Sequence, residues 1–449
     1  MRLVIIGGDA AGMSAASAAK RMDPTAEVIV LEKSEDVSYG ACGLPYKLAA
    51  GAMTDLEVMS AATFRDTRGI DLRLRHQVTG LDPASRTVTV QTPAGTTALS
   101  YDRLLLATGA SVWAPPIEGL SELLGRGVYF LKTLEDGRRL RERLERHKPA
   151  RVAVIGGGYI GLEATEGLQA LGAQVTVIEA LPLLLPFLSP PQRAAVMAEA
   201  EAHRVTVRTD TRVASIREQP DGSLQIATSS GTLQADLALV ATGVRPSSEL
   251  AREAGIALGA GGSVAVDGAL RTSAEGVWAA GDCADAQHAL TGRSTWVPLA
   301  LRANRSGKLA ASAMLGHQVA APPILGTAAF QFFGLQIART GLGLDEAVAA
   351  GFDAVAASVK TGTRAHYYPG GGPLFTSLVG ERGTGRLLGA VMVGPEGAAH
   401  RIDTVVAAIR GGMTATELYE LDLVYAPPFG PSWSPLLTAA SALVKAARR

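Results

Sequence analysis

Cysteine is scarce in this sequence, since the 449 residues contain only Cys42 and Cys283. Two cysteines cannot form the disulfide framework of a small secreted protein, so we expect a reducing, cytoplasmic environment. Long apolar runs are missing as well, because no stretch reaches the ~18–20 residues that a membrane-spanning helix needs. The opening stretch "MRLVIIGG" is typical of a first strand and not of a secretory signal.

Excess charge of either sign is also absent. The 42 basic residues balance the 42 acidic residues, so the formal net charge is zero. A balanced chain gives no indication of nucleic acid or of an anionic membrane as a partner, and we expect neither. The hydrophobic content of 47% is that of an ordered globular protein, and the chain is too long for one compact core. Two or three domains are therefore expected.

Two segments of the chain repeat one pattern. Residues 2–33 and 151–180 each contain an apolar strand, a glycine turn, an alanine-containing helix and a second strand that ends at a glutamate. This is the pattern of a βαβ unit that binds a dinucleotide, because turn glycines let the backbone approach a pyrophosphate at the helix N-terminus. The terminal glutamate accepts hydrogen bonds from ribose hydroxyls. Two such units predict two bound dinucleotides.

The two glycine turns match this pattern to different degrees. The second turn is complete, with Gly156, Gly158 and Gly161 at the expected spacing. The first turn has its outer glycines, but Asp9 stands in the place of the middle one.

Glu179, at the end of the second unit, indicates which coenzyme that unit prefers. Its carboxylate would accept hydrogen bonds from the ribose 2′- and 3′-hydroxyls and would repel a 2′-phosphate. The residues that follow, "ALPLLL", contain no arginine that could hold such a phosphate. We therefore expect NADH to be preferred over NADPH.

The two units, the segment "GVWAAGDCAD" (276–285) and a C-terminal α+β region together resemble the pyridine nucleotide–disulfide oxidoreductases over essentially the whole chain. The resemblance implies an α/β fold with two Rossmann-like domains, one for FAD and one for NAD(P)H, and a C-terminal α+β dimerisation domain. The implied partners are a second copy of the chain and a small-molecule disulfide. The implied boundaries are 1–112 and 246–322 for the FAD-binding domain, 113–245 for the NAD(P)H-binding domain and 323–449 for the dimerisation domain.

The resemblance also assigns the residues that bind the two cofactors, and it implies no metal. For FAD the assigned residues are Gly7, Gly8, Ala11, Gly12, Glu32, Lys33, Val78, Thr108, Gly109, Gly281, Asp282 and Ala300. For NAD they are Gly156, Gly158, Tyr159, Ile160, Gly161, Glu163, Glu179 and Gly243. Asp282 would lie near the FAD ribityl chain. Tyr159 and Glu163 would line the nicotinamide pocket.

Cys42 lies in "SYGACGLPY" (38–46), at the position of the redox cysteine of this family. Relatives that use a redox disulfide carry a second cysteine five positions earlier, whereas Val37 stands there in this chain. The chain therefore resembles the single-cysteine branch, which comprises NADH peroxidases and oxidases, coenzyme A disulfide reductases and persulfide reductases. Peroxidases and oxidases carry a histidine where this chain has Ala10. We read Cys283 as a small core residue.

The stretches "CGLPY", "YYPG" and "YAPPF" look like those of coenzyme A disulfide reductase. In that group two tyrosines, matching Tyr367 and Tyr425, reach the thiol of the partner subunit. The positions that line the coenzyme A channel correspond to Ser14, Arg21, Ser38, Arg68 and Asn304. Other channel positions differ in type, since Ala41 replaces an asparagine and Ala18 a glutamine, so the identity of the thiol stays open.

The motif also leads to expectations about mechanism. Pro45 suits the first turn of a helix, which would leave Cys42 just outside the helix N-terminus, where a helix dipole lowers a thiol's pKa. The Cys42 thiolate would attack a small disulfide, and electrons from NADH would pass through FAD to the resulting mixed disulfide. The alternatives are reduction of persulfide or polysulfide, oxidation of NADH by oxygen, and a flavoprotein that senses redox state or delivers electrons to another protein.

Overall fold

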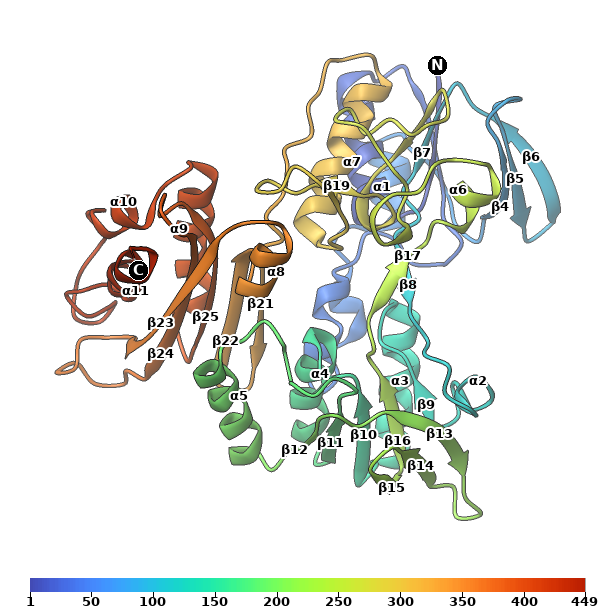
Figure 1. The fold of residues 1–449 in the computed structure, drawn as a ribbon. Helices are drawn as coiled ribbons and strands as arrows, with labels where there is room; N and C mark the ends of the chain where they lie inside the picture. The colour runs from blue at the N-terminus through green and yellow to red at the C-terminus, as the bar shows by residue number, and fades with distance from the viewer. Residues whose placement is uncertain (449) are drawn as a thin grey trace.

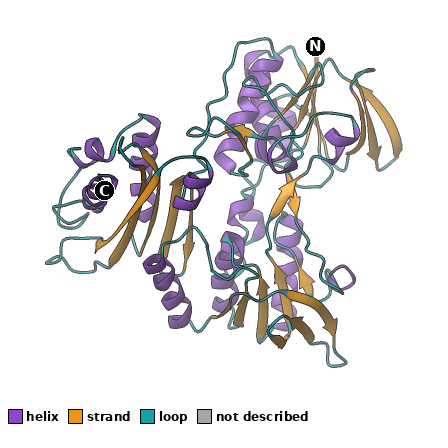
Figure 2. Ribbon diagram, in the orientation of Figure 1, coloured by secondary structure: helices purple, strands orange, loops and turns teal. Residues whose placement is uncertain are grey.

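A computed structural model describes residues 1–448, and it contains three sheet regions with helices packed against them (Figures 1 and 2). The first region is a parallel sheet in the order β18-β7-β1-β2-β3. Its central strands are runs of Val, Ile and Leu that are almost wholly buried, as expected for a parallel sheet covered on both faces. The strands are β1 (Arg2–Ile6), β2 (Glu27–Leu31), β3 (Asp71–Arg73), β7 (Arg103–Leu106) and β18 (Val277–Ala279).

The first sheet is completed by a strand from late in the chain. Strand β18 pairs in parallel with β7, so the chain returns to the first sheet after it has built the second. Helices α1 (Ala10–Met22) and α7 (Ala300–Met314) lie against each other beside this sheet (Figure 1). Cys283 follows β18 and is fully buried, as expected for a core residue.

The second region repeats the architecture of the first. Its parallel sheet has the order β12-β11-β10-β16-β9. The strands are β9 (Val128–Tyr129), β10 (Arg151–Ile155), β11 (Gln174–Ile178), β12 (Thr206–Arg208) and β16 (Leu237–Val240). The helices of this part of the chain are α2 (Leu120–Leu123), α3 (Leu134–His147), α4 (Tyr159–Ala170) and α5 (Pro190–Ala202).

Smaller antiparallel pieces connect and cover the two parallel sheets. Strands β8 (Ala110–Val112) and β17 (Val244–Pro246) pair where the chain passes between the two regions, as the middle of Figure 1 shows. The other pieces are β4 (Gln77–Asp82), β5 (Thr87–Thr92), β6 (Gly95–Ser100), β13 (Val213–Glu218), β14 (Leu224–Thr228), β15 (Gly231–Ala235), β19 (Ala286–Gln287), β20 (Ser294–Thr295) and helix α6 (Glu249–Glu253).

The third region is an antiparallel sheet in the order β21-β22-β25-β24-β23, with helices packed on it. The predicted fold class, two Rossmann-like units followed by an α+β region, is confirmed. Among residues 1–448 no helix is both long and apolar enough to cross a bilayer. The elements are β21 (Ala328–Phe332), β22 (Leu335–Gly341), α8 (Leu344–Ala349), β23 (Ala354–Gly362), β24 (Pro373–Glu381), β25 (Leu387–Gly394), α9 (Ala398–Arg410), α10 (Ala415–Tyr419) and α11 (Pro435–Ala447).

Candidate active site

The first glycine turn connects β1 to α1 and depends on glycine at both ends. Gly7 has a φ of 113°, and a Cβ atom there would lie 2.1 Å from the carbonyl oxygen of Ala107. A Cβ atom on Gly12 would lie 1.8 Å from the carbonyl oxygen of Gly7. The backbone N–H of Gly8 donates to Glu32 Oε2 at 2.7 Å, so the acid at the end of β2 holds the turn closed. The turn, the helix and the acid are one structural unit.

The second turn, between β10 and α4, has the same geometry. Gly156 has a φ of 109°, and the N–H of Gly157 donates to Glu179 Oε2 at 2.8 Å. A Cβ atom on Gly161 would lie 2.1 Å from the carbonyl oxygen of Gly156. Gly158 differs, because a Cβ atom there would meet no protein atom within 4 Å. The middle glycine therefore leaves room in front of the helix N-terminus, which is where a pyrophosphate binds in this kind of unit.

Asp9 occupies that middle position in the first turn. Its carboxyl accepts a hydrogen bond from the N–H of Tyr39 at 3.3 Å, so it connects the turn to the segment that carries Cys42. Burial is the main cause that raises the pKa of Asp9 to about 6. In the sequence, Asp9 is only the residue that replaces the middle glycine of the turn. The structure shows that its carboxyl group lies beside the cysteine segment.

One continuous cavity of about 2540 Å³ joins the two dinucleotide units. Its lining includes residues from both glycine turns, from the cysteine segment and from α7, which the sequence separates widely. The predicted site residues that line it are Ser38, Cys42, Gly156, Gly158, Tyr159, Ile160, Glu163, Glu179, Gly243, Asp282, Ala300 and Asn304. The structure thus brings together all but one of the predicted NAD residues, the cysteine and part of the predicted FAD set.

The remaining predicted FAD residues do not line this cavity. Lys33 is exposed, and Ala11 and Gly12 are buried where α1 begins. The FAD and NAD positions outside the cavity lining are Gly7, Gly8, Ala11, Gly12, Glu32, Lys33, Val78, Thr108, Gly109, Gly281 and Gly161.

Asp282 provides an independent indication that the first unit binds a ligand. Its Oδ1 atom is buried and has no hydrogen-bond partner among residues 1–448. A buried acceptor without a partner costs about 1–3 kcal/mol, which a ligand hydroxyl would recover. The ribityl chain of FAD carries such hydroxyls, so the residues present fit this cofactor.

Cys42 lies in a single 3₁₀ turn, Ala41–Gly43, and a second 3₁₀ turn, Pro45–Lys47, follows. The expected helix N-terminus beside Cys42 is therefore wrong, because neither turn continues into an α-helix with a sizeable dipole. The side chain is exposed at the cavity wall. Partial loss of solvent, and then the charge of Glu163, raises the pKa of the Cys42 thiol, while the Lys132 ammonium acts in the opposite direction. The expected lowering of this pKa is thus also wrong.

Glu163 is held in place by a residue that sequence analysis did not assign. Tyr46 donates its hydroxyl hydrogen to Glu163 Oε1 at 2.6 Å, and burial raises the pKa of Glu163. The only signal for Tyr46 was its place in "CGLPY", three residues beyond Gly43. Tyr159, one turn before Glu163 on α4, stacks on Phe330 of β21 with ring centroids 4.6 Å apart. Helix α4 thus meets both the cysteine segment and the third sheet.

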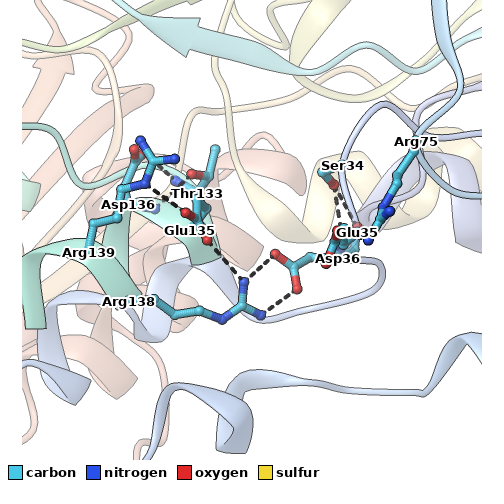
Figure 3. A network of polar contacts seen from close by, with 9 residues as sticks. All are labelled: Ser34, Glu35, Asp36, Arg75, Thr133, Glu135, Asp136, Arg138 and Arg139. Atoms are coloured by element: carbon cyan, nitrogen blue, oxygen red, sulfur yellow. Dashed lines mark hydrogen bonds and ion pairs between the residues drawn. The ribbon is translucent and has the colours of Figure 1, made fainter. Parts of the chain in front are cut away.

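A network of polar contacts fixes the loop that leads to Cys42 (Figure 3). Arg138 on α3 donates to both oxygens of Asp36, at 2.8 and 2.5 Å. Thr133 caps the same helix, since its Oγ1 accepts from the N–H of Asp136 at 3.1 Å. Lys132, which lines the cavity, directly precedes this cap. The network therefore sets the position of the cysteine segment and of the nearby ammonium group relative to each other.

Four of the five predicted coenzyme A residues lie on or against one face of α1, whereas Ser38 lies in the cysteine segment. Ser14 donates to Asn304 Oδ1 on α7 at 2.6 Å, and Arg68 donates to Ser17 Oγ at 2.6 Å. Arg21 lies two turns beyond Ser14 on the same helix and is exposed. Asn304, at the other end of this face, lines the cavity.

Tyr367 and Tyr425 form a hydrogen-bonded pair on the third region, with hydroxyl oxygens 2.8 Å apart. Their side chains are 63% and 44% exposed, and neither lines the cavity that contains Cys42. The exposed side chains of Phe429 and Trp433 lie in the same C-terminal segments. Within one chain, the tyrosine pair and the cysteine belong to separate surfaces.

We expect Glu163→Gln to lower the pKa of the Cys42 thiol, because the substitution removes a negative charge that disfavours the thiolate. The pH profile of iodoacetamide alkylation should move toward lower pH, with alkylation at pH 7 at least about twofold faster, since the thiolate is the reactive form. Glu122→Gln, an exposed carboxylate outside the cavity, should leave the profile unchanged. A profile that does not move in Glu163→Gln contradicts the electrostatic account of the thiol.

Comparison with known proteins identifies the family. The model for "Pyridine nucleotide-disulphide oxidoreductase" matches residues 1–307, and the model for its dimerisation domain matches residues 327–435. A relative from Pyrococcus horikoshii named NAD(P)H coenzyme A polysulfide/persulfide reductase is 38% identical over 98% of both chains. A coenzyme A disulfide reductase from Staphylococcus haemolyticus is 27% identical over 95% of this chain and 96% of its own.

A solved structure shows that the likeness extends to the fold. The NAD-dependent persulfide reductase from A. fulgidus superimposes with a TM-score of 0.94 and 35% identity, over 99% of this chain and 83% of that one. These matches agree with the geometry of the site, in which one cavity joins two glycine turns of the same form. The chain belongs to the pyridine nucleotide–disulphide oxidoreductase family, whose members use FAD and NAD(P)H.

Proposed function

We propose that this chain is a coenzyme A disulfide reductase that passes electrons from NADH through FAD to a mixed disulfide between Cys42 and coenzyme A. The observation that carries the proposal is the position of the two cysteines. Cys42 is exposed at the wall of a cavity shared by both dinucleotide units, whereas Cys283 is fully buried in the core. Cys283 is the only other cysteine of the chain and it is buried, so we infer that the second sulfur comes from a small molecule.

The proposed cycle balances in atoms and electrons. The Cys42 thiolate attacks one sulfur of coenzyme A disulfide, forming a mixed disulfide and releasing one coenzyme A thiolate. Two electrons from NADH then cleave the mixed disulfide, which regenerates the Cys42 thiolate and releases the second coenzyme A. The sum is one NADH, one proton and one disulfide converted to NAD⁺ and two thiols. Bound FAD would supply the two-electron carrier between the nicotinamide and the sulfur.

The chain's own residues have defined tasks in this cycle. The two glycine turns would hold the dinucleotides, and Asp282 would accept a hydrogen bond from a ribityl hydroxyl of FAD. The Lys132 ammonium stabilises the Cys42 thiolate, and Glu163, fixed by Tyr46, borders the same space. Along α1, Arg68 and Arg21 would bind phosphate groups of coenzyme A, because guanidinium groups pair well with phosphate.

We also propose that the active site is shared between two subunits of a homodimer. The match to a dimerisation domain supports the dimer, and the exposed Tyr367–Tyr425 pair supports a role toward the partner's Cys42. Hydrogen bonds from Ser432 and from Tyr367 lower the pKa of Tyr425. A tyrosine held in this way can donate its proton to a leaving thiolate. The cysteine content fits a reducing cytoplasm as the place of action.

Reduction of coenzyme A persulfide or polysulfide is the second candidate. Two relatives at 38% and 35% identity carry polysulfide or persulfide reductase names, whereas the coenzyme A disulfide reductase from S. haemolyticus is 27% identical. The chemistry at Cys42 is the same, since a thiolate attacks a sulfur–sulfur bond in either substrate.

A substrate panel tests the proposal. Anaerobic oxidation of NADH by the FAD-loaded enzyme is measured with coenzyme A disulfide, coenzyme A persulfide, polysulfide and, separately, oxygen. We expect the highest kcat/KM with coenzyme A disulfide. A higher value with the persulfide or polysulfide would transfer the assignment to the second candidate. Negligible turnover of all four would favour a flavoprotein that delivers electrons to another protein.

In the same assays Tyr425→Phe should slow disulfide turnover and leave flavin reduction by NADH unchanged. An unchanged rate of disulfide turnover would limit Tyr425 to a packing role at the interface.

A further inference from the structure

An arginine without a partner lies at the adenosine end of the second dinucleotide unit. Arg212 lines the shared cavity together with Glu179, Ala180 and Leu181, and its side chain is exposed. Within residues 1–448 its guanidinium group makes no ion pair and no hydrogen bond; only its backbone N–H donates, to Ser229 Oγ at 3.0 Å. The residues directly after Glu179 contain no arginine, and Arg212 lies more than 30 residues further along the chain.

Backbone hydrogen bonds fix the position of Arg212 beside Glu179. The N–H of Glu179 donates to the carbonyl oxygen of Arg208 at 2.8 Å, at the end of β12. The turn that follows β12 donates back, from Thr211 N–H to Glu179 O at 2.9 Å and from Asp210 N–H to Leu181 O at 2.8 Å. Arg212 is the next residue after this turn, so it is held next to the residues that bind the adenosine ribose in such a unit.

Glu179 is itself fixed and cannot swing away from its neighbours. Its Oε2 accepts from the N–H of Gly157, and its Oε1 accepts from the N–H of Leu181, both at 2.8 Å. Each carboxylate oxygen keeps a further lone pair for a ribose hydroxyl. The ribose would therefore meet a fixed carboxylate, and Arg212, whose neighbour Thr211 is bonded to the backbone of Glu179, lines the same cavity.

We propose that Arg212 binds the 2′-phosphate of NADPH, so that this chain accepts NADPH as well as NADH. The inference rests on the proposed function in one respect, the binding of the nicotinamide coenzyme at the second unit. A 2′-phosphate is repelled by the Glu179 carboxylate, and a guanidinium group offsets this repulsion because it pairs with phosphate through two parallel hydrogen bonds. NADH needs no such group, since its ribose hydroxyls donate to the carboxylate. Glu179 thus binds the ribose hydroxyls of NADH, and Arg212 binds the 2′-phosphate of NADPH.

Binding of adenosine 2′,5′-bisphosphate to the FAD-loaded enzyme tests the proposal without turnover. Calorimetry should show that Arg212→Ala lowers the affinity for this ligand by roughly 10- to 100-fold, because charge-assisted hydrogen bonds are lost. Adenosine 5′-monophosphate, which lacks the 2′-phosphate, should bind the variant as it binds the parent. In steady-state assays kcat/KM should fall for NADPH and stay unchanged for NADH, and Arg212→Lys should recover part of the loss.

Arg217→Ala is the matched control. Arg217 lies on β13, pairs with Glu118 at 3.0 Å and does not line the cavity. Its replacement by alanine should therefore change the binding of neither adenosine ligand. Equal binding of the bisphosphate to the parent and to Arg212→Ala would overturn the proposal. An equal loss for both adenosine ligands would overturn it as well, because it would show a structural role. A separate variant, Gly158→Ala, tests whether the second unit binds the coenzyme at all, because unchanged NADH binding in that variant would show that it does not.

Discussion

Cys42→Ser should abolish NADH-dependent disulfide reduction, with a loss of at least roughly 10³-fold, while FAD stays bound and is still reduced by NADH. A serine hydroxyl is not ionised near neutral pH and cannot form a mixed disulfide, so the step that joins enzyme to substrate disappears. Cys42 is exposed at the cavity wall and lies outside the packed core, so the substitution leaves no cavity in the fold. Flavin absorbance in rapid-mixing experiments separates the two half-reactions.

The second cysteine supplies the control for this result. Cys283 is fully buried, and its sulfur lies 3.3 Å from the carbonyl oxygens of Leu106 and Ala280. Cys283→Ala should keep the rate of disulfide reduction and lower only the stability, by about 1 kcal/mol for the small cavity it leaves. If Cys42→Ser retained the parental rate, the thiol mechanism would be wrong. Loss of activity in Cys283→Ala with stable folding would contradict its purely structural role.

Gly158→Ala should weaken NADH binding by roughly 10- to 100-fold and leave the thermal stability of the protein unchanged. A methyl group at this position meets no protein atom within 4 Å, so the fold tolerates it. The same methyl group would occupy the space that the coenzyme pyrophosphate needs at the N-terminus of α4. The KM for NADH and the rate of flavin reduction at limiting NADH measure the effect, and thermal unfolding measures stability.

Gly161→Ala gives the contrasting outcome. Its added Cβ atom would lie 2.1 Å from the carbonyl oxygen of Gly156, so the turn itself must deform and stability should fall along with binding. Unchanged NADH binding in a stable Gly158→Ala protein would show that the second unit does not hold the coenzyme. This outcome would remove the basis for the role of Arg212 while leaving the thiol chemistry of Cys42 intact.

Much of the FAD and NAD units could be predicted because their signals are local. Each βαβ unit places a strand, a glycine turn, a helix and an acid within about 30 residues, and the backbone demands of Gly7 and Gly156 are visible as sequence spacing. In the structure both units have the same geometry, since a backbone N–H of each glycine turn donates to the glutamate that follows the second strand. The two turns that were read from spacing alone have the expected form.

The surroundings of Cys42 could not be predicted in the same way. Pro45 is compatible with several kinds of turn, and the chain forms two 3₁₀ turns there in place of an α-helix. The charges that act most strongly on the thiol come from Glu163 and Lys132, which lie far away in the sequence. Such electrostatic effects depend on distance in space and on exclusion of solvent, and neither is written in local spacing.

The sequence by itself determined the two dinucleotide units and the family, because each depends on residue types at short, regular intervals. Only the tertiary structure decided that Tyr46 holds Glu163, that Asp9 contacts the cysteine segment and that Arg212 stands beside Glu179. These pairs form when separate segments pack against one another. Their contacts follow from the pairing of strands and the packing of helices, which bring together segments that are far apart in the chain.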